Sequence, residues 1–327
     1  MRRTSGARGK MRLASIDIGT NSTRLLVART EGTKTETIVR RMEITRLGEG
    51  VDKRGFLSSE AIDRTLKVLE EYRECADEFS ATKIFAAATS ALRDAENGGE
   101  FLLAAEKVLG TRPRVLSGEE EAELSFTGAM SDIGNARGRV LVFDIGGGST
   151  ELVVGDAKGG KEGFTQVSSR SVNVGCVRMS ERFLATDPPS PVSIGRMESH
   201  IYLALKPALD LLASEGVSMG VGLAGTVTTL SGMVLGLEEY NSEKIHHSKL
   251  KRSEVRELFM ELAKVGLEER KKIMRFEPKR ADVIIGGAAV LGVLMDIARL
   301  DEILVSEKDI LDGMILDGYG KYSAQRT

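Results

Sequence analysis

The segment DIGTNSTRLLV at residues 17–27 determines the fold, because a close copy, DIGGGSTELVV, follows at residues 144–154. Seven of the eleven positions are identical, and the copies lie 127 residues apart, about the length of one domain. Each copy begins at the end of a predicted buried strand, residues 12–18 or 140–143, and leads into another strand. A glycine-bearing turn between two strands, used twice in this way, indicates an internal duplication. We therefore expect an α/β protein with two similar halves.

The composition is that of an ordinary globular protein: the 327 residues are 41% apolar and carry a formal net charge of −2. The 36 glycines exceed the usual share of about 7%, whereas there are only 6 prolines. This excludes collagen-like and disordered chains, so the surplus glycine must lie inside folded structure. A nearly neutral chain also argues against a nucleic-acid partner, which would require a basic footprint.

The cysteines and histidines exclude two further classes of site. The two cysteines, Cys75 and Cys176, lie far apart in the sequence, which argues against a disulfide framework. Together with only three histidines, they are too few for a Cys/His metal centre. We expect a cytoplasmic protein. The longest uncharged run, residues 283–295, is too short to span a bilayer and predicts a buried helix, so no membrane partner is expected. The basic N-terminus lacks an apolar stretch, which predicts a tail and not a signal peptide.

Apolar periodicity and turn residues place the other elements. Ser58 or Ser59 is expected to cap a helix that runs to residue 79, and Gly32 and Gly159-Gly160 to lie in hairpin turns. The remaining predictions are strands at 23–30, 35–40, 83–88, 219–224 and 302–305, and helices at 100–109, 195–215, 253–265, 281–298 and 308–318. We expect a flexible basic tail at residues 1–10, a first domain at 11–130 and a second at 131–307. The polar stretch 131–139 would connect them, and a C-terminal helix at about 308–325 would pack back on the first domain.

The two turns have the chemistry of a phosphate cradle. Glycine lets backbone N–H groups approach an oxyanion, and small hydroxyl or amide side chains add donors. The alternative is a pair of hairpin turns whose glycines are purely structural. The presence of two copies, which would face each other across a cleft, disfavours this alternative. The candidate phosphate-binding residues are Asp17, Gly19, Thr20, Asn21, Ser22 and Arg24 in the first copy, and Gly146, Gly147, Gly148, Ser149 and Thr150 in the second.

Two acids flank the second turn. Asp144 and Glu151 are separated hard-oxygen ligands of the kind that Mg²⁺ prefers, with Mn²⁺ as a second candidate. Solvated surface acids are the alternative. Asp144 follows an apolar strand, which favours the metal interpretation.

An acid cluster at residues 119–121 follows Leu116-Ser117-Gly118 at a predicted strand-to-helix junction. These acids could simply complement the helix dipole, or one of them could take a proton from an attacking water. Composition leaves both interpretations open. Arg93 follows another strand and is a candidate phosphate ligand, although a surface arginine is the commoner case.

Other patterns are weaker. Gly220 to Gly225 matches GxGxxG, but no second strand ends in an acid about 20 residues later, which disfavours a dinucleotide site. The same stretch is a third glycine turn at a helix start, with Gly225 and Thr226 as phosphate ligands. His200 and the pair His246-His247 are expected to be structural or surface residues.

Taken together, IDIGTNSTRLL, TSALRDA, LSGEEEAEL and VFDIGGGSTELV resemble the exopolyphosphatase/guanosine-pentaphosphate phosphohydrolase (Ppx/GppA) family. The resemblance also covers VNVGCVR at 172–178 and GLAGT at 222–226, and extends over about residues 12 to 318. It implies two ribonuclease-H-like domains of the actin/sugar-kinase/Hsp70 superfamily with a cleft between them. It also implies Mg²⁺-dependent release of terminal phosphate from inorganic polyphosphate, or of the 5′-γ-phosphate from pppGpp, and by analogy a homodimer.

The resemblance assigns roles residue by residue. Glu121 matches the family's catalytic base and Arg93 its phosphate-gripping arginine, while Asp144 and Glu151 match the acids linked to Mg²⁺. The glycine turns match its phosphate sites. The chain departs from the family at 309–313, Asp-Ile-Leu-Asp-Gly, where many members have Arg-Glu-Gly, so no phosphate contact is expected there. Larger members carry a C-terminal helical domain, which we do not expect in this chain.

Three alternatives share these motifs. The first is a pppGpp phosphohydrolase, which differs only in substrate. The second is a sugar or acetate kinase of the same superfamily, which the acid cluster argues against because a hydrolase needs a water-activating acid. The third is a non-catalytic actin-like protein or a polyphosphate or nucleotide sensor, which the intact catalytic positions disfavour.

Overall fold

Each copy of the repeated segment joins an antiparallel strand pair at the centre of its own sheet. In the computed structural model, which describes residues 10–32, 34–134, 136–158 and 164–324, β1 (Met11–Ile18) pairs with β2 (Thr23–Glu31). In the second copy β6 (Arg137–Ile145) pairs in the same way with β7 (Thr150–Lys158). Both turns close with the same hydrogen bond. Gly19 N–H donates to the Ser22 carbonyl and Gly146 N–H to the Ser149 carbonyl, each at 3.0 Å.

The two sheets share one topology, which confirms the predicted duplication and α/β class. The first has the order β3-β2-β1-β4-β5, and the second repeats it as β8-β7-β6-β9-β11 with β10 added at the edge. In both, the central strand is antiparallel to one neighbour and parallel to the other, as in ribonuclease-H-like, actin-like domains. The other strands are β3 (Lys34–Glu43), β4 (Lys83–Ala88), β5 (Arg114–Val115), β8 (Phe164–Val172), β9 (Met219–Leu223), β10 (Lys249–Lys251) and β11 (Glu302–Val305).

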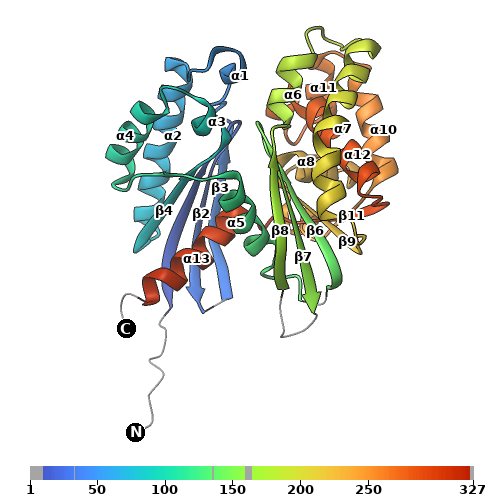
Figure 1. Ribbon diagram of the computed structural model, residues 1–327. Helices are drawn as coiled ribbons and strands as arrows, with labels where there is room; N and C mark the ends of the chain where they lie inside the picture. The colour runs from blue at the N-terminus through green and yellow to red at the C-terminus, as the bar shows by residue number, and fades with distance from the viewer. Residues whose placement is uncertain (1–9, 33, 135, 159–163, 325–327) are drawn as a thin grey trace.

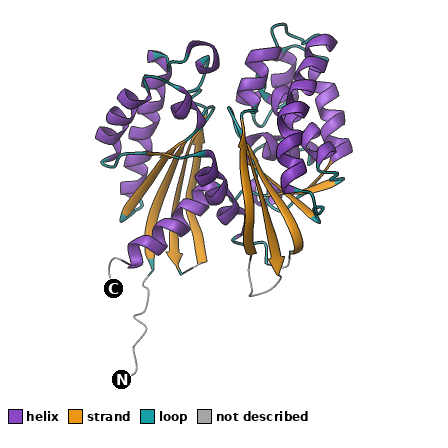
Figure 2. Ribbon diagram, in the orientation of Figure 1, coloured by secondary structure: helices purple, strands orange, loops and turns teal. Residues whose placement is uncertain are grey.

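Helices cover both faces of each sheet (Figures 1 and 2). On the outer faces, α2 and α4 pack on the first sheet, and α7, α8, α10 and α12 pack on the second. Ser58 caps α2 by accepting a hydrogen bond from Ala61 N–H, and the predicted buried helix is α12. The helices are α1 (Val51–Arg54), α2 (Ser59–Glu78), α3 (Ser90–Asp94), α4 (Gly98–Leu109), α5 (Gly118–Met130), α6 (Cys176–Phe183), α7 (Pro191–Leu212), α8 (Ala224–Val234), α9 (Ser242–Ile245), α10 (Arg252–Ala263), α11 (Leu267–Ile273), α12 (Ile284–Ile297) and α13 (Ile310–Ala324).

Helices α5 and α13 lie between the two sheets and contact each other (Figure 1). The apolar face of α13 packs on β1 and β2, whereas that of α5 packs on β6, β7 and β8. At the crossing, a Cβ on Gly128 would overlap the Asp309 carbonyl oxygen, and one on Gly313 would overlap the Leu124 carbonyl oxygen. The two backbones therefore touch, and no side chain fits between them. The predicted domain boundary at residues 130/131 coincides with the end of α5 and stays a prediction.

The pleat of the two central strands, β1 and β6, places the repeated aspartates on the sheet faces that pack against α5 and α13. Alternate residues of a strand face opposite sides of the sheet. Along β1, Leu13 packs toward α13 and Ser15 Oγ donates to the Leu311 carbonyl of that helix, so Asp17 follows on the same face. Along β6, Val140 and Val142 pack toward α5, and Asp144 follows them.

The connection between the two sheets differs from the sequence prediction, and some predicted segments lie outside the described residues. The predicted connection at residues 131–139 is shorter in the structure, because β6 already begins at Arg137. The basic tail at residues 1–9, Thr33 and the turn at Gly159-Gly160 lie outside the described residues. None of the helices in the described part of the chain is long and apolar enough to cross a bilayer.

Substituting Gly313→Ala should destabilise the fold, because the added methyl group has to push α13 away from the Leu124 carbonyl. We expect a loss of about 1–3 kcal/mol or more in the free energy of unfolding, measured by urea titration. Gly320→Ala on the same helix is the matched control, since a Cβ there meets no atom within 4 Å. That variant should gain up to about 1 kcal/mol from helix propensity. Equal effects of the two substitutions would contradict the close crossing.

Candidate active site

The two glycine turns meet at a small cavity of about 60 Å³ between the sheets. They are in direct contact, because a Cβ on Gly147 would lie 2.8 Å from Thr20 Cβ and one on Gly148 would lie 3.2 Å from Thr20 Oγ1. A Cβ on Gly148 would also overlap Ser90 Oγ at the start of α3. Glycine is thus required here by the close approach of the opposite turn. The predicted site residues that line the cavity are Asp17, Gly19, Thr20, Asn21, Ser22, Arg24, Glu121, Asp144, Gly146, Gly147, Gly148, Ser149 and Gly225.

Backbone amides at the two turns are free to bind an oxyanion. Within the described residues, the N–H groups of Thr20, Asn21, Gly147 and Gly148 donate to no protein acceptor. Successive amides of this kind form an anion-binding concavity. The arrangement matches the phosphate cradle expected from the sequence.

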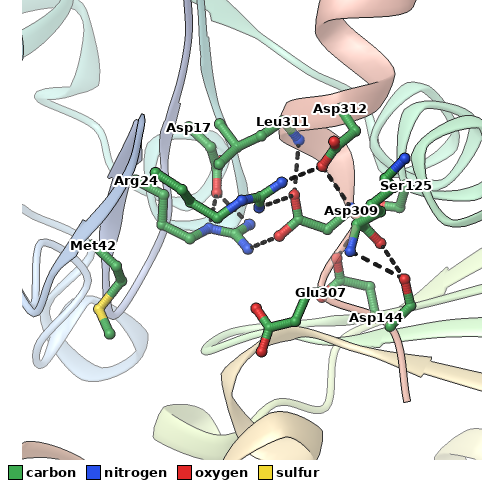
Figure 3. Close-up of polar contacts among 12 residues, drawn as sticks. Asp17, Arg24, Met42, Ser125, Asp144, Glu307, Asp309, Leu311 and Asp312 are labelled. Carbon is green, nitrogen blue, oxygen red and sulfur yellow. Dashed lines mark hydrogen bonds and ion pairs between the residues drawn. The ribbon is translucent and has the colours of Figure 1, made fainter. Parts of the chain in front are cut away.

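The first aspartate is paired with an arginine. Asp17 is opposite Arg24 in the β1–β2 register, and its Oδ2 accepts from Arg24 Nε at 2.9 Å and from Nη2 at 2.6 Å. The remaining Nη1 of Arg24 donates to Asp309, so the guanidinium lies between two carboxylates (Figure 3). Arg24, expected to bind phosphate, is thus already bound to protein acceptors. Asp17 Oδ1 is buried and has no hydrogen-bond partner.

The second aspartate is opposite a second acid. Asp144 pairs with Glu151 in the β6–β7 register, at the position that Arg24 occupies in the first copy. Burial, reinforced by neighbouring carboxylates, raises the pKa of Asp144 to about 6, and burial together with the Asp144 charge raises that of Glu151 to about 7. Asp144 Oδ2 accepts from Ser125 Oγ at 3.2 Å, and Glu151 Oε1 accepts from Ser171 Oγ at 2.8 Å. Glu151 Oε2 is buried without a partner.

Neighbouring residues of the acid cluster at 119–121 have different roles in the structure. Glu120 closes a capping box with Ser117 at the start of α5, as the helix-start interpretation predicts. Glu121 is buried and lines the cavity, with Oε2 bound to Arg93 Nη1 at 2.8 Å. Burial and the Glu151 charge raise the pKa of Glu121, and Arg93 opposes this rise. Arg93 also donates to the Leu116 carbonyl, which fixes its guanidinium beside the acid.

Two predicted phosphate ligands lie outside the cavity. Thr150 Oγ1 donates to the Val174 carbonyl at 2.6 Å, and Thr226 lies in the first turn of α8 against Gly287 of α12. Gly225 lines the cavity next to Ala224, whose φ of +65° is rare for a residue with a side chain. Such strain is typical of functional sites, and it supports the interpretation of this stretch as a third turn.

The structure adds Ser90 to the predicted site residues and shows that Asn21, already a candidate, is buried there. Ser90 Oγ and Asn21 Nδ2 are buried, line the cavity and have no hydrogen-bond partner. An unpaired buried polar group costs free energy, so both groups are poised for a ligand. Ser90 follows the strand at residues 83–88 in the same segment as Arg93, but only the charge of the arginine had drawn attention to that segment.

A larger cavity of about 340 Å³ adjoins the first and shares Arg24, Ala224, Gly225 and Arg280 with it. Its other charged lining residues are Arg40, Arg41, Glu277, Glu307 and Asp309. Arg40 is bound to Asp309 and Asp312, whereas Arg41 and Arg280 have no carboxylate within ion-pair distance in the described part of the chain. Two uncommitted arginines therefore face the space next to the turns.

The histidine pair lies elsewhere. Asp132, His246 and His247 are the one group of potential metal ligands found close together in the described residues. His246 Nδ1 accepts from Glu307 N–H at 3.1 Å, so the neutral ring carries its proton on Nε2 and donates it to Asp132 at 2.9 Å. A metal ion at Nε2 would have to displace that proton, so the geometry favours the expected structural role.

Comparison with known proteins agrees with this architecture. Residues 26–321 match the Ppx/GppA phosphatase family. The chain is 38% identical over 318 residues to exopolyphosphatase 2 of Mycobacterium tuberculosis, covering 93% of this chain and 98% of that one. A crystal structure of an exopolyphosphatase-like protein superimposes with a TM-score of 0.89 at 33% identity, covering 96% of this chain and 99% of that one. The Ppx/GppA family member of Aquifex aeolicus gives a TM-score of 0.78 at 31% identity, with 96% and 99% covered.

If Ser90 donates to a bound phosphate, Ser90→Ala should lower kcat/KM for phosphate release by about 10–100-fold, the loss of one or two hydrogen bonds to a charged group. The free energy of unfolding should stay constant or rise, because the hydroxyl has no partner in the protein. Thr30→Val is the matched control, since it also removes a buried unpaired hydroxyl, but on β2 away from the cavity. A Ser90 variant with normal activity and reduced stability would show a structural role instead.

Proposed function

The chain belongs to the Ppx/GppA phosphatase family, and from this premise we propose that it is an exopolyphosphatase that hydrolyses the terminal phosphoanhydride bond of inorganic polyphosphate. The observation that carries the proposal is the pairing of Glu121 with Arg93 beside two phosphate turns in one cavity. A hydrolase must activate water, and Glu121 is a buried carboxylate placed in the cavity to accept its proton. The proposal also agrees with the name and the full-length similarity of the M. tuberculosis relative.

A divalent cation is part of the proposed site. Asp144 and Glu151 face each other with elevated pKa values, and Glu151 Oε2 lacks any partner, which suits a hard cation such as Mg²⁺. These two residues would hold the ion, with the unpaired Oδ1 of Asp17 close to the same cavity. Bound there, the ion would neutralise carboxylate charge and polarise phosphate oxygens.

The protein groups would work as follows. The free amides of both turns, with Ser90 and Asn21, hold the oxygens of the terminal phosphate. Glu121 accepts a proton from a water that attacks this phosphorus in line, and the bond to the bridging oxygen breaks. Orthophosphate and a chain shorter by one unit are the products. Arg93 favours the ionised form of Glu121 and orients it, and positioning with electrostatic stabilisation lowers most of the barrier.

The rest of the substrate chain would occupy the larger cavity. Arg41 and Arg280 supply positive charge there, and the shared lining residues lead directly from it to the turns. Guanidinium groups bind phosphates through paired N–H donors. The same cavity could accept the nucleoside part of pppGpp, so both substrates belong in the test.

The decisive experiment is phosphate release by the purified chain with Mg²⁺ and long polyphosphate, pppGpp or ATP. We expect polyphosphate to be hydrolysed, and Glu121→Gln to lower kcat by about 10²–10⁴-fold because the proton acceptor is lost. Glu119→Gln, in the same helical turn but exposed, should retain the wild-type rate.

Each result has a definite meaning. If no substrate releases phosphate, the hydrolase proposal fails. If pppGpp alone is hydrolysed, the reaction class stands and the substrate is corrected. If Glu121→Gln is as active as wild type, the base is another residue.

The opposed acids also predict how stability depends on pH and metal. Without divalent ions the folded state keeps protons on Asp144 to about pH 6 and on Glu151 to about pH 7, whereas the unfolded chain releases them near pH 4. Folded carboxylates with raised pKa values therefore make the free energy of unfolding fall as the pH rises from about 4 to 7. Melting curves in a chelator should show this fall. Millimolar Mg²⁺ should reverse it near pH 8 but not near pH 5.

The Glu151→Gln variant isolates this effect from other titrating groups. It should show a smaller fall between pH 5 and 8 and a weaker Mg²⁺ response, while Glu119→Gln should behave like wild type. An unchanged Mg²⁺ response in Glu151→Gln would contradict the assigned metal ligand.

A further inference from the structure

Arg178 is a buried charge to which the proposed reaction assigns no role. It lies in the first turn of α6, at the end of the segment VNVGCVR. Its guanidinium is bound on three sides. Nε donates to the Gly148 carbonyl at 2.7 Å, Nη1 donates to Asp52, and Nη2 donates to Asp94.

These three acceptors lie on both sides of the cleft. Gly148 belongs to the second phosphate turn, whereas Asp52 on α1 and Asp94 at the end of α3 belong to the part of the chain that packs around the first sheet. Helix α3 also carries Ser90 and Arg93, so Asp94 moves together with a cavity-lining donor and with the partner of Glu121. A single side chain therefore links the second turn to α1 and to the helix that holds catalytic groups.

The start of α6 also determines which way the second turn faces. The N–H groups of Cys176, Val177 and Arg178 donate to the carbonyls of Gly146 and Gly147 at 2.9–3.1 Å, and Arg178 Nε takes the next carbonyl, that of Gly148. With all three carbonyls bound to α6, the amides of Gly147 and Gly148 stay free on the cavity side.

We propose that Arg178 is a positioning residue that orients the Gly146–Gly148 turn for phosphate only when the two halves close on each other through Asp52 and Asp94. The planar guanidinium reaches three acceptors in fixed directions at once, which a lysine ammonium on its flexible stem does not reproduce. Phosphate binding and cleft closure thus favour each other, because both need the same set of bonds. This inference rests on the proposed function for its kinetic readout, but it also has a binding readout that requires no turnover.

Arg182 provides a matched control one turn further along α6. Its Nε and Nη2 bind the same Asp52, the latter at 2.6 Å, yet among the described residues it makes no hydrogen bond to the phosphate turn. Its side chain is more exposed than that of Arg178, at 38% against 10%. Comparing the two residues separates the effect on the turn from the loss of an ion pair across the cleft.

The test compares Arg178→Lys, Asp94→Asn and Arg182→Met with wild type. For each we would measure kcat and KM for phosphate release, the melting temperature, and the affinity for inorganic phosphate in the presence of Mg²⁺. We expect Arg178→Lys to lower kcat/KM by about 10–100-fold and to weaken phosphate binding although the positive charge is kept, since small misplacements of binding groups have effects of this size. Asp94→Asn keeps Arg178 paired with Asp52 and should fold normally, with a smaller loss in the same direction. Arg182→Met should stay within about threefold of wild type.

Several outcomes would overturn the inference. It fails if Arg178→Lys binds phosphate as tightly as wild type, or if Arg182→Met loses as much affinity as Arg178→Lys at a similar melting temperature. If Arg178→Lys does not fold, Asp94→Asn provides the test instead. Phosphate affinity equal to that of wild type in Asp94→Asn would then count against the inference. If wild type binds phosphate but hydrolyses none of the three substrates, the proposed function fails, while weaker binding in Arg178→Lys would still support the positioning role.

Discussion

The site depends on the close crossing of α5 and α13. Each helix packs on one sheet, and at Gly128 and Gly313 the two backbones touch without an intervening side chain. The spacing between the sheets is therefore set by backbone contact, which varies less than a layer of flexible side chains. Because β1 and β6 both point their terminal aspartates at this middle layer, the crossing brings Asp17 and Asp144 to one cavity. The contact of Gly147 with Thr20 across that cavity is possible only at this spacing.

Duplication supplied two similar turns, and one substitution gave them different electrostatics. The position opposite the aspartate is Arg24 in the first copy and Glu151 in the second. In the first copy the buried carboxylate is neutralised within its own strand pair. In the second, two buried carboxylates lie opposite each other. Burial raises the pKa of both, and neighbouring carboxylates add to the rise. The Asp17 carboxylate thus has a counter-ion within its own strand pair, whereas Asp144 has none; under the proposed function a bound cation would take that place.

The sequence predicted features that follow from local patterns. Strand alternation, helical spacing and the repeated turn led to the duplicated α/β architecture, whereas the acid cluster left its role open and only the family resemblance singled out Glu121. What it could not show were contacts between distant positions. Arg178 meets Asp52, 126 residues away, and Arg24 meets Asp309, 285 residues away, so the guanidinium that was expected to bind phosphate is held by protein carboxylates. Ser90 was missed because a serine without a partner is recognised only when the surrounding residues are in place.

The charge balance of the cavity has a consequence for what can bind there. Asp17, Glu121 and Asp144 contribute three buried carboxyl groups to its lining, and Glu151 lies beside Asp144. The guanidinium groups of Arg24 and Arg93 are already bound to acids, which leaves Arg280 as the uncommitted cation among the described lining residues. The other uncommitted donors are neutral amides and hydroxyls, which orient a phosphate but do not offset its charge. A single guanidinium does not balance these acids and a polyanion together, whereas a cation and a phosphate that arrive together neutralise each other. Under the proposed function, metal and substrate must each tighten the binding of the other, since the linkage is reciprocal. The near-zero net charge of the whole chain is compatible with a polyanionic substrate for this reason: under the proposed function, a bound cation would add to the positive charge of a few local arginines.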